Sequence, residues 1–252
     1  MRFSPQMRAL DFLVNRPIAH RGLHDKVNGI IENTASAFAA AIDGEYAIEC
    51  DLQLTSDGEA IVFHDERLDR LTDAKGWVKD LTAAEMKEVE IRGSSDRVQT
   101  LDELLEQVDG RVPLVIELKS HWDRDDALVT RALDVLQDYA GPHCLMSFDP
   151  DIIEAVRVQS PETVRGIVAD RAVDSFYASL PMDRRLELRT FSHMDRTAPH
   201  FISFHFSDLP WAPVTRFRDA GNPVITWTIR SPEQAALARR YSDQITFERF
   251  LA

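Results

Sequence analysis

Apolar runs of strand length alternate with amphipathic, helix-like segments along most of the chain. Residues 114–118 read Leu-Val-Ile-Glu-Leu and are mostly apolar, as strands of parallel sheets are. The next segment repeats apolar residues at helical spacing from Leu128 to Tyr139. Strand signals occur near residues 18, 48, 115, 145, 166, 203, 226 and 246. Their alternation with helices predicts a (β/α)8 TIM barrel, with a doubly wound open sheet as the second choice.

Helix starts and loops subdivide this pattern. The capping-box pattern, a Ser or Thr followed three residues later by Glu or Gln, begins at Thr82, Thr100 and Ser231. Asn33 is predicted to cap a helix, and residues 6–14 to form a short leading helix. Residues 65–99, after the second strand and its return arm, form a short insertion. We expect one domain over residues 1–252, because this length suits one α/β barrel and no linker or repeat interrupts it.

Acidic and apolar residues alternate in the second predicted strand. Because successive strand residues point to opposite faces, Glu49 and Asp51 share a face while Cys50 lies on the other. Two adjacent carboxylates repel each other unless a cation lies between them. For this pair alone, a solvated polar face is the simplest interpretation. Glu117 on the next parallel strand adds a third carboxylate at the same rim, and this oxygen-only set suits Mg²⁺ or Ca²⁺.

Histidines and basic residues follow the ends of the same predicted strands. His20 and His64 each end an apolar run. Two histidines on opposite sides of a metal suit proton transfer to and from a phosphoryl oxygen. Arg21 and Lys119 would supply positive charge at this rim. Because barrel active sites gather at the carboxyl ends of the strands, these residues form the predicted catalytic rim.

Two aromatic residues also stand at predicted strand ends. Phe148 and Trp227 either form a wall for glycerol or a head group, or pack against the rim. The other six histidines lack partners at ligand spacing and are interpreted as surface or core residues, His24 among them. His121 follows Lys119 closely enough to be a modest candidate for substrate contact.

Charge and cysteine content restrict the partners and the compartment. A formal charge of −13 argues against nucleic acid or an anionic membrane surface as a partner. An anionic small-molecule substrate would need a metal or a few placed basic residues. The two cysteines, Cys50 and Cys144, suggest reduced thiols, and no segment has signal-peptide or membrane-spanning character. We therefore expect a cytoplasmic protein without a membrane span; oligomeric state has no signature in the sequence.

Several short motifs are shared with a known family. They are His20-Arg21-Gly22, Glu32-Asn33-Thr34, Glu49-Cys50-Asp51, Thr55-Ser56-Asp57-Gly58, His64-Asp65 and Glu117-Leu118-Lys119. In order and spacing they resemble the glycerophosphodiester phosphodiesterase family. The resemblance is specific over residues 17–120 and continues weakly through Ser147-Phe148 and Trp227-Thr228.

The resemblance implies a fold, a cofactor and a reaction. The family's fold is a TIM barrel. Its members would hold a divalent cation, Mg²⁺ or Ca²⁺, with the residues that correspond here to Glu49, Asp51 and Glu117. His20 and His64 would be general acid and base, while Arg21 and Lys119 grip the phosphate. The usual reaction, part of glycerol and lipid metabolism, hydrolyses a glycerophosphodiester to sn-glycerol 3-phosphate and an alcohol.

The chain departs from the family pattern in two places. Many members carry a long insertion where residues 65–99 are short, so the rim is expected to be open. The last strand of members usually ends in an Asp-containing segment, where this chain has Glu248. Two other functions stay open. One is the same chemistry on a lysophospholipid or another phosphodiester, similar to a phospholipase D, and the other is a non-catalytic barrel that binds sugar phosphates.

Overall fold

A computed structural model describes residues 10–252, in which eight parallel strands form a closed ring. They are β1 (Ile18–Ala19), β2 (Ala47–Leu54), β4 (Leu114–Leu118), β5 (His143–Ser147), β6 (Arg165–Ala169), β7 (Phe201–His205), β8 (Val224–Ile229) and β9 (Gln244–Phe247). β1 pairs with β2 on one side and with β9 on the other, which closes the ring. The predicted TIM barrel is confirmed, and the open-sheet alternative is wrong.

A hairpin lengthens the second barrel strand. β3 (Ala60–Val62) runs antiparallel to β2 and pairs with its last residues. The turn between them contains Gly58 at φ +81°, a left-handed conformation that glycine adopts without steric cost. As a result, Glu49 and Asp51 lie in the middle of β2 rather than at its end, where the sequence pattern had placed them. Register sets Asp51 beside Glu117 on β4.

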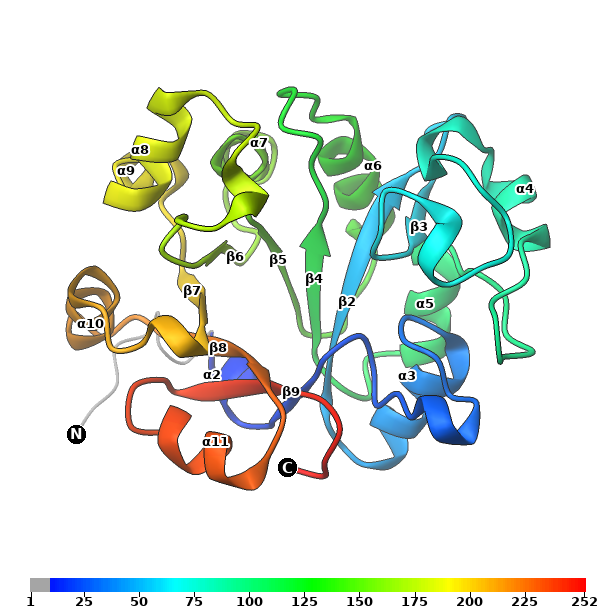
Figure 1. Cartoon of the computed structure of the whole chain (residues 1–252), viewed down its shortest axis with the longest axis horizontal. Helices are drawn as coiled ribbons and strands as arrows, with labels where there is room; N and C mark the ends of the chain where they lie inside the picture. Colours follow the sequence, from blue (N-terminus) through cyan, green and yellow to red (C-terminus); the bar gives the residue numbers. More distant parts are fainter. Residues whose placement is uncertain (1–9) are drawn as a thin grey trace.

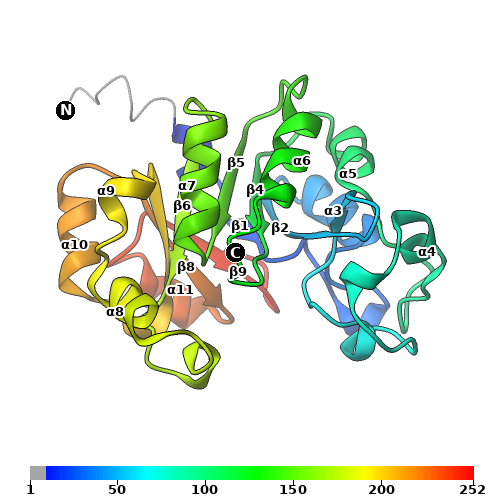
Figure 2. The ribbon, with the colours of Figure 1, turned by 90° about the horizontal axis from the view of Figure 1, so that it is seen from above.

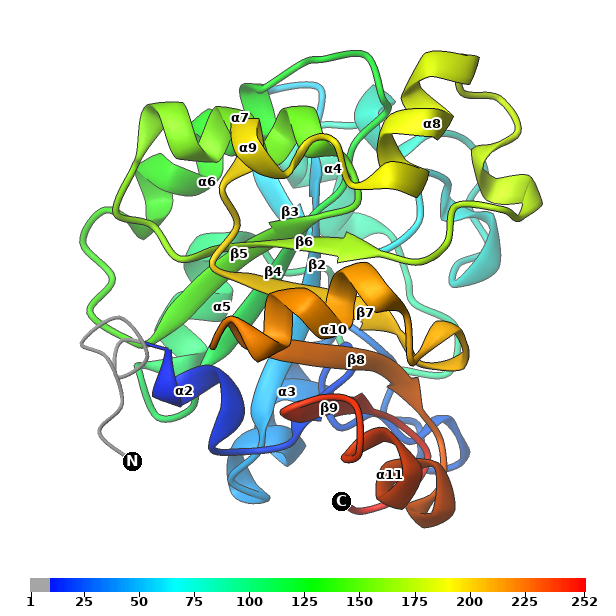
Figure 3. The same cartoon turned by 90° about the vertical axis from the view of Figure 1, so that its left-hand side faces the viewer.

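Helices cover the outside of the barrel (Figures 1 and 3). They are α2 (Asp11–Val14), α3 (Ala35–Asp43), α4 (Ala83–Glu88), α5 (Leu101–Val108), α6 (Ala127–Leu136), α7 (Pro150–Gln159), α8 (Met182–Thr190), α9 (Met194–Thr197), α10 (Ala212–Asp219) and α11 (Pro232–Ala238). Figure 2 shows α4 at one side of the molecule and α8 to α10 at the other. Within residues 10–252, no helix is both long and apolar enough to cross a membrane.

Apolar side chains pack on both sides of the strands. Cys50 lies on the outer side of β2, in one buried cluster with Phe38 of α3 and Leu104 of α5. Val115 and Phe201 belong to a second cluster, inside the barrel. Full burial of a large apolar side chain stabilises a fold by about 1.5–3 kcal/mol. The alternation along β2 therefore fixes which face carries the acids, since a one-residue slip would put Glu49 and Asp51 among the helices.

The capping predictions have mixed outcomes. Thr82 and Thr100 begin α4 and α5 with the predicted reciprocal capping boxes. Ser231 caps α11, but the side chain of Gln234 accepts from Arg230 N instead of completing the box. The Asn33 prediction is wrong because Thr34 is the N-cap of α3.

Two further predictions concern segments around the barrel. Of the predicted leading helix, residues 11–14 are helical and residues 6–9 lie outside the described part of the chain. Residues 65–99 contain α4 and two short 3-10 turns, Leu68–Arg70 and Val78–Asp80. This segment packs its own small apolar cluster, which includes Met86, against Ile61 and Phe63.

Candidate active site

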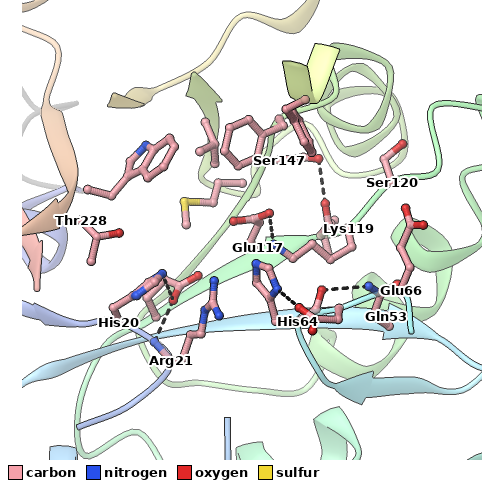
Figure 4. A pocket seen from close by; sticks show the side chains of 18 of the residues that line it. His20, Arg21, Gln53, His64, Glu66, Glu117, Lys119, Ser120, Ser147 and Thr228 are labelled. Atoms are coloured by element: carbon pink, nitrogen blue, oxygen red, sulfur yellow. Dashed lines mark hydrogen bonds and ion pairs between the residues drawn. The ribbon is translucent and has the colours of Figure 1, made fainter. Parts of the chain in front are cut away.

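A cavity of about 750 Å³ opens at the carboxyl ends of the barrel strands. Every residue that the sequence pattern assigned to the rim, except Asp51, lines it. Figure 4 shows five of these side chains pointing toward a common space: His20 and Arg21 from the end of β1, His64 from the end of β3, and Glu117 and Lys119 from the end of β4. Asp51 contacts two of the lining residues, Lys119 and Arg21. The structure therefore brings the predicted residues together.

Three buried carboxylates form the centre of the site. Glu49, Asp51 and Glu117 each offer an oxygen, and these oxygens lie within 4.8 Å of one another. Their exposed fractions are only 2%, 1% and 7%. The amine of Lys119 lies 2.7 Å from Asp51 Oδ1 and 2.5 Å from Glu117 Oε1. One ammonium group thus bridges two of the three acids.

The charge balance within this acidic triad is uneven. Burial raises the pKa of Glu49 well above its usual range, and Asp51 and Glu117 raise it further. Burial acts in the same direction on Asp51, but Lys119, His64 and Arg21 outweigh it and hold the pKa of that carboxyl well below its ordinary value. The triad is therefore short of positive charge at Glu49. Three buried carboxylates that lack enough positive charge between them fit a hard divalent cation such as Mg²⁺ or Ca²⁺.

Each predicted catalytic histidine has a carboxylate partner. His20 follows β1, and its Nδ1 lies 2.7 Å from Glu248 Oε2. Burial lowers the pKa of His20. His64 follows β3, and its Nδ1 lies 2.6 Å from Asp65 Oδ1. The side-chain amide of Gln53 donates to the His64 carbonyl at 3.0 Å and so fixes the backbone there.

A chain of ion pairs connects the two sides of the site. Arg21 Nη1 lies 2.5 Å from Glu32 Oε1, and Arg70 Nη2 lies 2.7 Å from the same oxygen. Arg70 Nε also donates to Asp65 Oδ2 at 2.6 Å. Burial works to raise the pKa of Glu32, but Arg70 and Arg21 lower it to about 2. Glu32 and Arg70 thus link the partner of His64 to Arg21, a network that periodicity could not indicate.

Asn33 has a different role from the predicted helix cap. Its backbone is left-handed at φ 56°, and its side-chain nitrogen donates to Asp51 Oδ2 at 2.8 Å. Asn33 Oδ1 also accepts from Asp51 N at 3.4 Å. The residue therefore orients a carboxylate of the acidic triad. The Glu32-Asn33-Thr34 motif was the one sequence signal for it, although that motif does not reveal the contact.

Aromatic rings line part of the cavity. The ring centroids of Phe148 and Trp227 are 5.4 Å apart with the planes nearly perpendicular. Phe148 also contacts Phe176 at 5.9 Å between centroids. Trp227 Nε1 donates to Ser203 O at 3.1 Å, which satisfies its only polar group. Both predicted aromatic residues therefore reach the cavity, and the structure adds Phe176, which lies in a segment without clear periodicity.

Two other histidines, His24 and His121, contact carboxylates near the site. His24 Nε2 lies 3.7 Å from Glu248 Oε2, so the prediction that His24 lacks a partner and is an ordinary surface or core residue is wrong. Together with His20 and Glu248 it forms a second group whose ligand atoms converge. His121 Nδ1 lies 3.3 Å from Glu66 Oε1. Glu66 lines the cavity whereas His121 does not, so substrate contact by His121 stays a prediction.

Fold and site together define a TIM-barrel protein with an acidic site and two carboxylate-bound histidines at the carboxyl ends of its strands. The chain belongs to the glycerophosphoryl diester phosphodiesterase family, whose model matches residues 20–244. This finding confirms the resemblance inferred from the motifs.

Individual relatives support the same assignment. A glycerophosphodiester phosphodiesterase of Caldanaerobacter subterraneus subsp. tengcongensis is 42% identical over 111 residues, which cover 41% of this chain and 44% of that protein. The matched segment thus spans less than half of that relative.

Solved structures share the fold. A phosphodiesterase of Oleispira antarctica, in complex with the product sn-glycerol-3-phosphate, has a TM-score of 0.79 at 22% identity, covering 95% of this chain and 94% of that chain. A glycerophosphodiester phosphodiesterase of Thermotoga maritima has a TM-score of 0.71 at 24% identity, covering 91% and 92%. At these identities the likeness establishes the barrel.

Proposed function

We propose that this protein hydrolyses glycerophosphodiesters to sn-glycerol 3-phosphate and an alcohol with the help of Mg²⁺ or Ca²⁺. The observation that carries the proposal is the placement of two carboxylate-bound histidines, His20 and His64, beside a buried triad of carboxylates in one cavity. Membership of the glycerophosphoryl diester phosphodiesterase family supports the same reaction.

Glu49, Asp51 and Glu117 would hold the cation. Their buried oxygens converge, and Asn33 keeps Asp51 turned toward the others. A bound divalent cation supplies charge stabilisation at a phosphoryl oxygen. Lys119 and Arg21 already neutralise Asp51 in part, which keeps two fixed positive charges beside the phosphate position.

Arg21 is suited to grip the phosphate because its side chain is held from two sides. Nη1 contacts Glu32, and Nε lies 3.4 Å from Asp51 Oδ2. A planar guanidinium fixed in this way can present its remaining N–H groups to two phosphate oxygens. Lys119 would add a point charge from β4.

His20 and His64 would divide the proton transfers. Cleavage of a phosphodiester requires removal of a proton from the attacking oxygen, either water or a neighbouring hydroxyl of the glycerol. It also requires delivery of a proton to the leaving alkoxide. Two histidines in different environments can do this at one pH, since one can be neutral while the other is protonated. His20 has 14% of its side chain exposed and His64 has 30%.

The aromatic wall of Phe148, Phe176 and Trp227 offers a contact surface for glycerol carbons or for the alcohol. Phe176 is 58% exposed, so an apolar surface extends from the cavity to its mouth. This exposed ring is the observation that favours the second candidate, the same chemistry on a lysophospholipid. A non-catalytic sugar-phosphate-binding barrel is disfavoured, because binding alone does not require a carboxylate partner on each histidine.

A substrate panel tests the proposal. The protein would be assayed with glycerophosphocholine, glycerophosphoethanolamine, glycerophosphoglycerol and lysophosphatidylcholine, with Mg²⁺ and Ca²⁺ in turn. Release of sn-glycerol 3-phosphate would be measured for the three water-soluble diesters. Release of lysophosphatidic acid would be measured for lysophosphatidylcholine, which keeps its acyl chain when the head group leaves. The double variant His20→Ala/His64→Ala serves as the background control. Release of sn-glycerol 3-phosphate from a water-soluble diester above this background supports the leading proposal. Turnover of the lysophospholipid alone supports the second, and no turnover with either ion overturns both.

A further inference from the structure

Glu248 occupies a fixed position opposite His20, set by the closure of the barrel. In the β1–β9 pair, Ala19 lies opposite Phe247, so the next residues on the two strands are His20 and Glu248. His20 N donates to Phe247 O at 2.9 Å, and Glu248 N donates to Ile229 O at 3.0 Å. The main chains of both residues are therefore held by the ladder, and the side chains meet in the cavity.

The Glu248 carboxylate divides its two oxygens between different partners. Oε2 contacts His20 Nδ1 at 2.7 Å, while Oε1 accepts from Arg230 Nε at 2.7 Å. Arg249 Nε lies 3.3 Å from the same Oε1. With one oxygen held by arginine and only 8% of the side chain exposed, the carboxylate cannot rotate away without losing an ion pair.

We propose that Glu248 is a positioning residue that fixes the tautomer and ring orientation of His20, with Arg230 holding Glu248 in place. An ionised carboxylate can only accept a hydrogen bond, so the contact requires the proton of neutral His20 to reside on Nδ1. Nε2 then carries the lone pair, and it points to the acidic triad, 4.0 Å from Glu49 Oε2. Proton exchange with a substrate oxygen would occur at Nε2. The inference rests on the proposed role of His20 in hydrolysis.

Without Glu248, the imidazole would lose two constraints. Neutral histidine would populate both tautomers, and the ring would be free to turn about its side-chain torsions. His24, whose Nε2 lies 3.7 Å from Glu248 Oε2, would lose its carboxylate contact as well. In other enzymes, loss of an orienting carboxylate lowers turnover without removing the histidine itself.

The test combines kinetics with a direct measurement of the tautomer. We would compare wild type, Glu248→Ala and Glu248→Gln, with Glu90→Gln as a control at an exposed carboxylate that does not line the cavity. We expect Glu248→Ala to lose roughly 10- to 1,000-fold in kcat with little change in KM. Glu248→Gln should recover part of the loss, because its amide oxygen can accept the same hydrogen bond.

¹⁵N NMR of the histidine side chains gives a readout independent of activity. Wild-type His20 should carry its proton on Nδ1, and the Glu248→Ala protein should show a mixture or the Nε2 tautomer. Unchanged kcat in Glu248→Ala, or an Nδ1 proton that persists in it, would overturn the inference. If wild type hydrolyses no diester, the proposed function fails, whereas the tautomer comparison still decides whether Glu248 positions His20. Circular dichroism checks folding, and Glu248→Gln carries the test if Glu248→Ala does not fold.

Discussion

Asp51 and Glu117 stand side by side on paired strands, and the amine of Lys119 bridges them at 2.7 and 2.5 Å. Lys119 is therefore placed to neutralise two acids of the triad at once. Glu49, the third, has no basic side chain within ion-pair distance apart from His20 at 4.0 Å, among residues 10–252. Its pKa is raised well above the usual range by burial and by the other two acids. A further positive charge is most needed at Glu49.

Removal of divalent ions should therefore abolish activity. We expect an EDTA-treated, desalted protein to be inactive and to recover when Mg²⁺ or Ca²⁺ is returned. Asp51→Asn should weaken metal binding by more than about 100-fold, since loss of an outer partner alone costs about 10- to 100-fold. Isothermal titration calorimetry would measure the affinity, with Glu90→Gln as the control. Full activity after chelation would contradict a role for the cation.

Arg21→Lys should lower kcat/KM although the positive charge is kept. Lysine cannot reproduce the planar fork that contacts Glu32 and Asp51 and presents further N–H groups. A hydrogen bond to a charged group contributes about 1.5–3 kcal/mol, so we expect kcat/KM to fall by about 10- to 100-fold. Steady-state kinetics would be compared with Arg97→Lys, a control at a half-exposed arginine. Near-wild-type kinetics for Arg21→Lys would mean that Arg21 has a structural role.

The sequence pattern predicted what depends on local geometry. The two-residue period of a strand placed Glu49 and Asp51 on one face, and the structure agrees because that period is a property of the backbone. The return arm after the second strand was also predicted, and β3 forms it. Only the place of the two acids along the strand was wrong, because β2 continues past Asp51 to Leu54, where it pairs with β3.

The sequence pattern could not predict side-chain contacts between segments that are far apart in the sequence. Asparagine is a residue type that often caps helices, but the side chain of Asn33 donates a hydrogen bond to Asp51 on β2 instead. Likewise, Arg70 contacts both Asp65 and Glu32, and Glu32 precedes Arg70 by 38 positions in the sequence. Such side-chain networks follow no period, so only the folded barrel reveals them.

His193 should make stability depend on pH below neutrality. The ring is 1% exposed, and burial first, then Arg196 and Arg184, lowers its pKa to about 4. In the unfolded chain the pKa is about 6.5, so the unfolded state binds the proton first as pH falls. The neutral form is thus fully stabilising above pH 6.5, and this stability is lost as pH falls toward 4. The loss amounts to about 2 kcal/mol between pH 7 and 5, at about 1.4 kcal/mol per pH unit.

Urea unfolding at pH 7 and pH 5 would measure this dependence. His193→Gln and His193→Asn remove the titrating group, so their free energies of unfolding should change less than that of wild type between the two pH values. Both variants are expected to be less stable at pH 7, since they disturb the packing of His193 against Phe191. Equal pH dependence in wild type and variants would show that His193 is not the responsible group.

Replacement of either of the two histidines proposed to transfer protons should lower the rate without changing the affinity for a divalent cation. His20→Ala and His64→Ala should each cost roughly 10²–10⁴-fold in kcat, the range of general acid–base catalysis. Activity of wild type should follow a bell-shaped pH profile. It rises as the base loses its proton and falls as the acid loses its own, and each single variant should lose one limb. Metal affinity should hardly change, because neither ring belongs to the acidic triad.

Of the two histidines, His64 allows the more decisive test of a role in proton transfer. Its Nδ1 contacts Asp65, which Arg70 also holds. The alternative to proton transfer is therefore a structural role, in which His64 only orients Asp65 at the end of the hairpin. His64→Gln distinguishes the two roles, since its amide can donate to Asp65 but cannot exchange a proton at neutral pH. If His64 transfers protons, His64→Gln should be as inactive as His64→Ala in single-turnover assays. If His64→Gln, or His64→Ala, keeps more than about a tenth of wild-type activity, the residue is structural and another group must serve as acid or base.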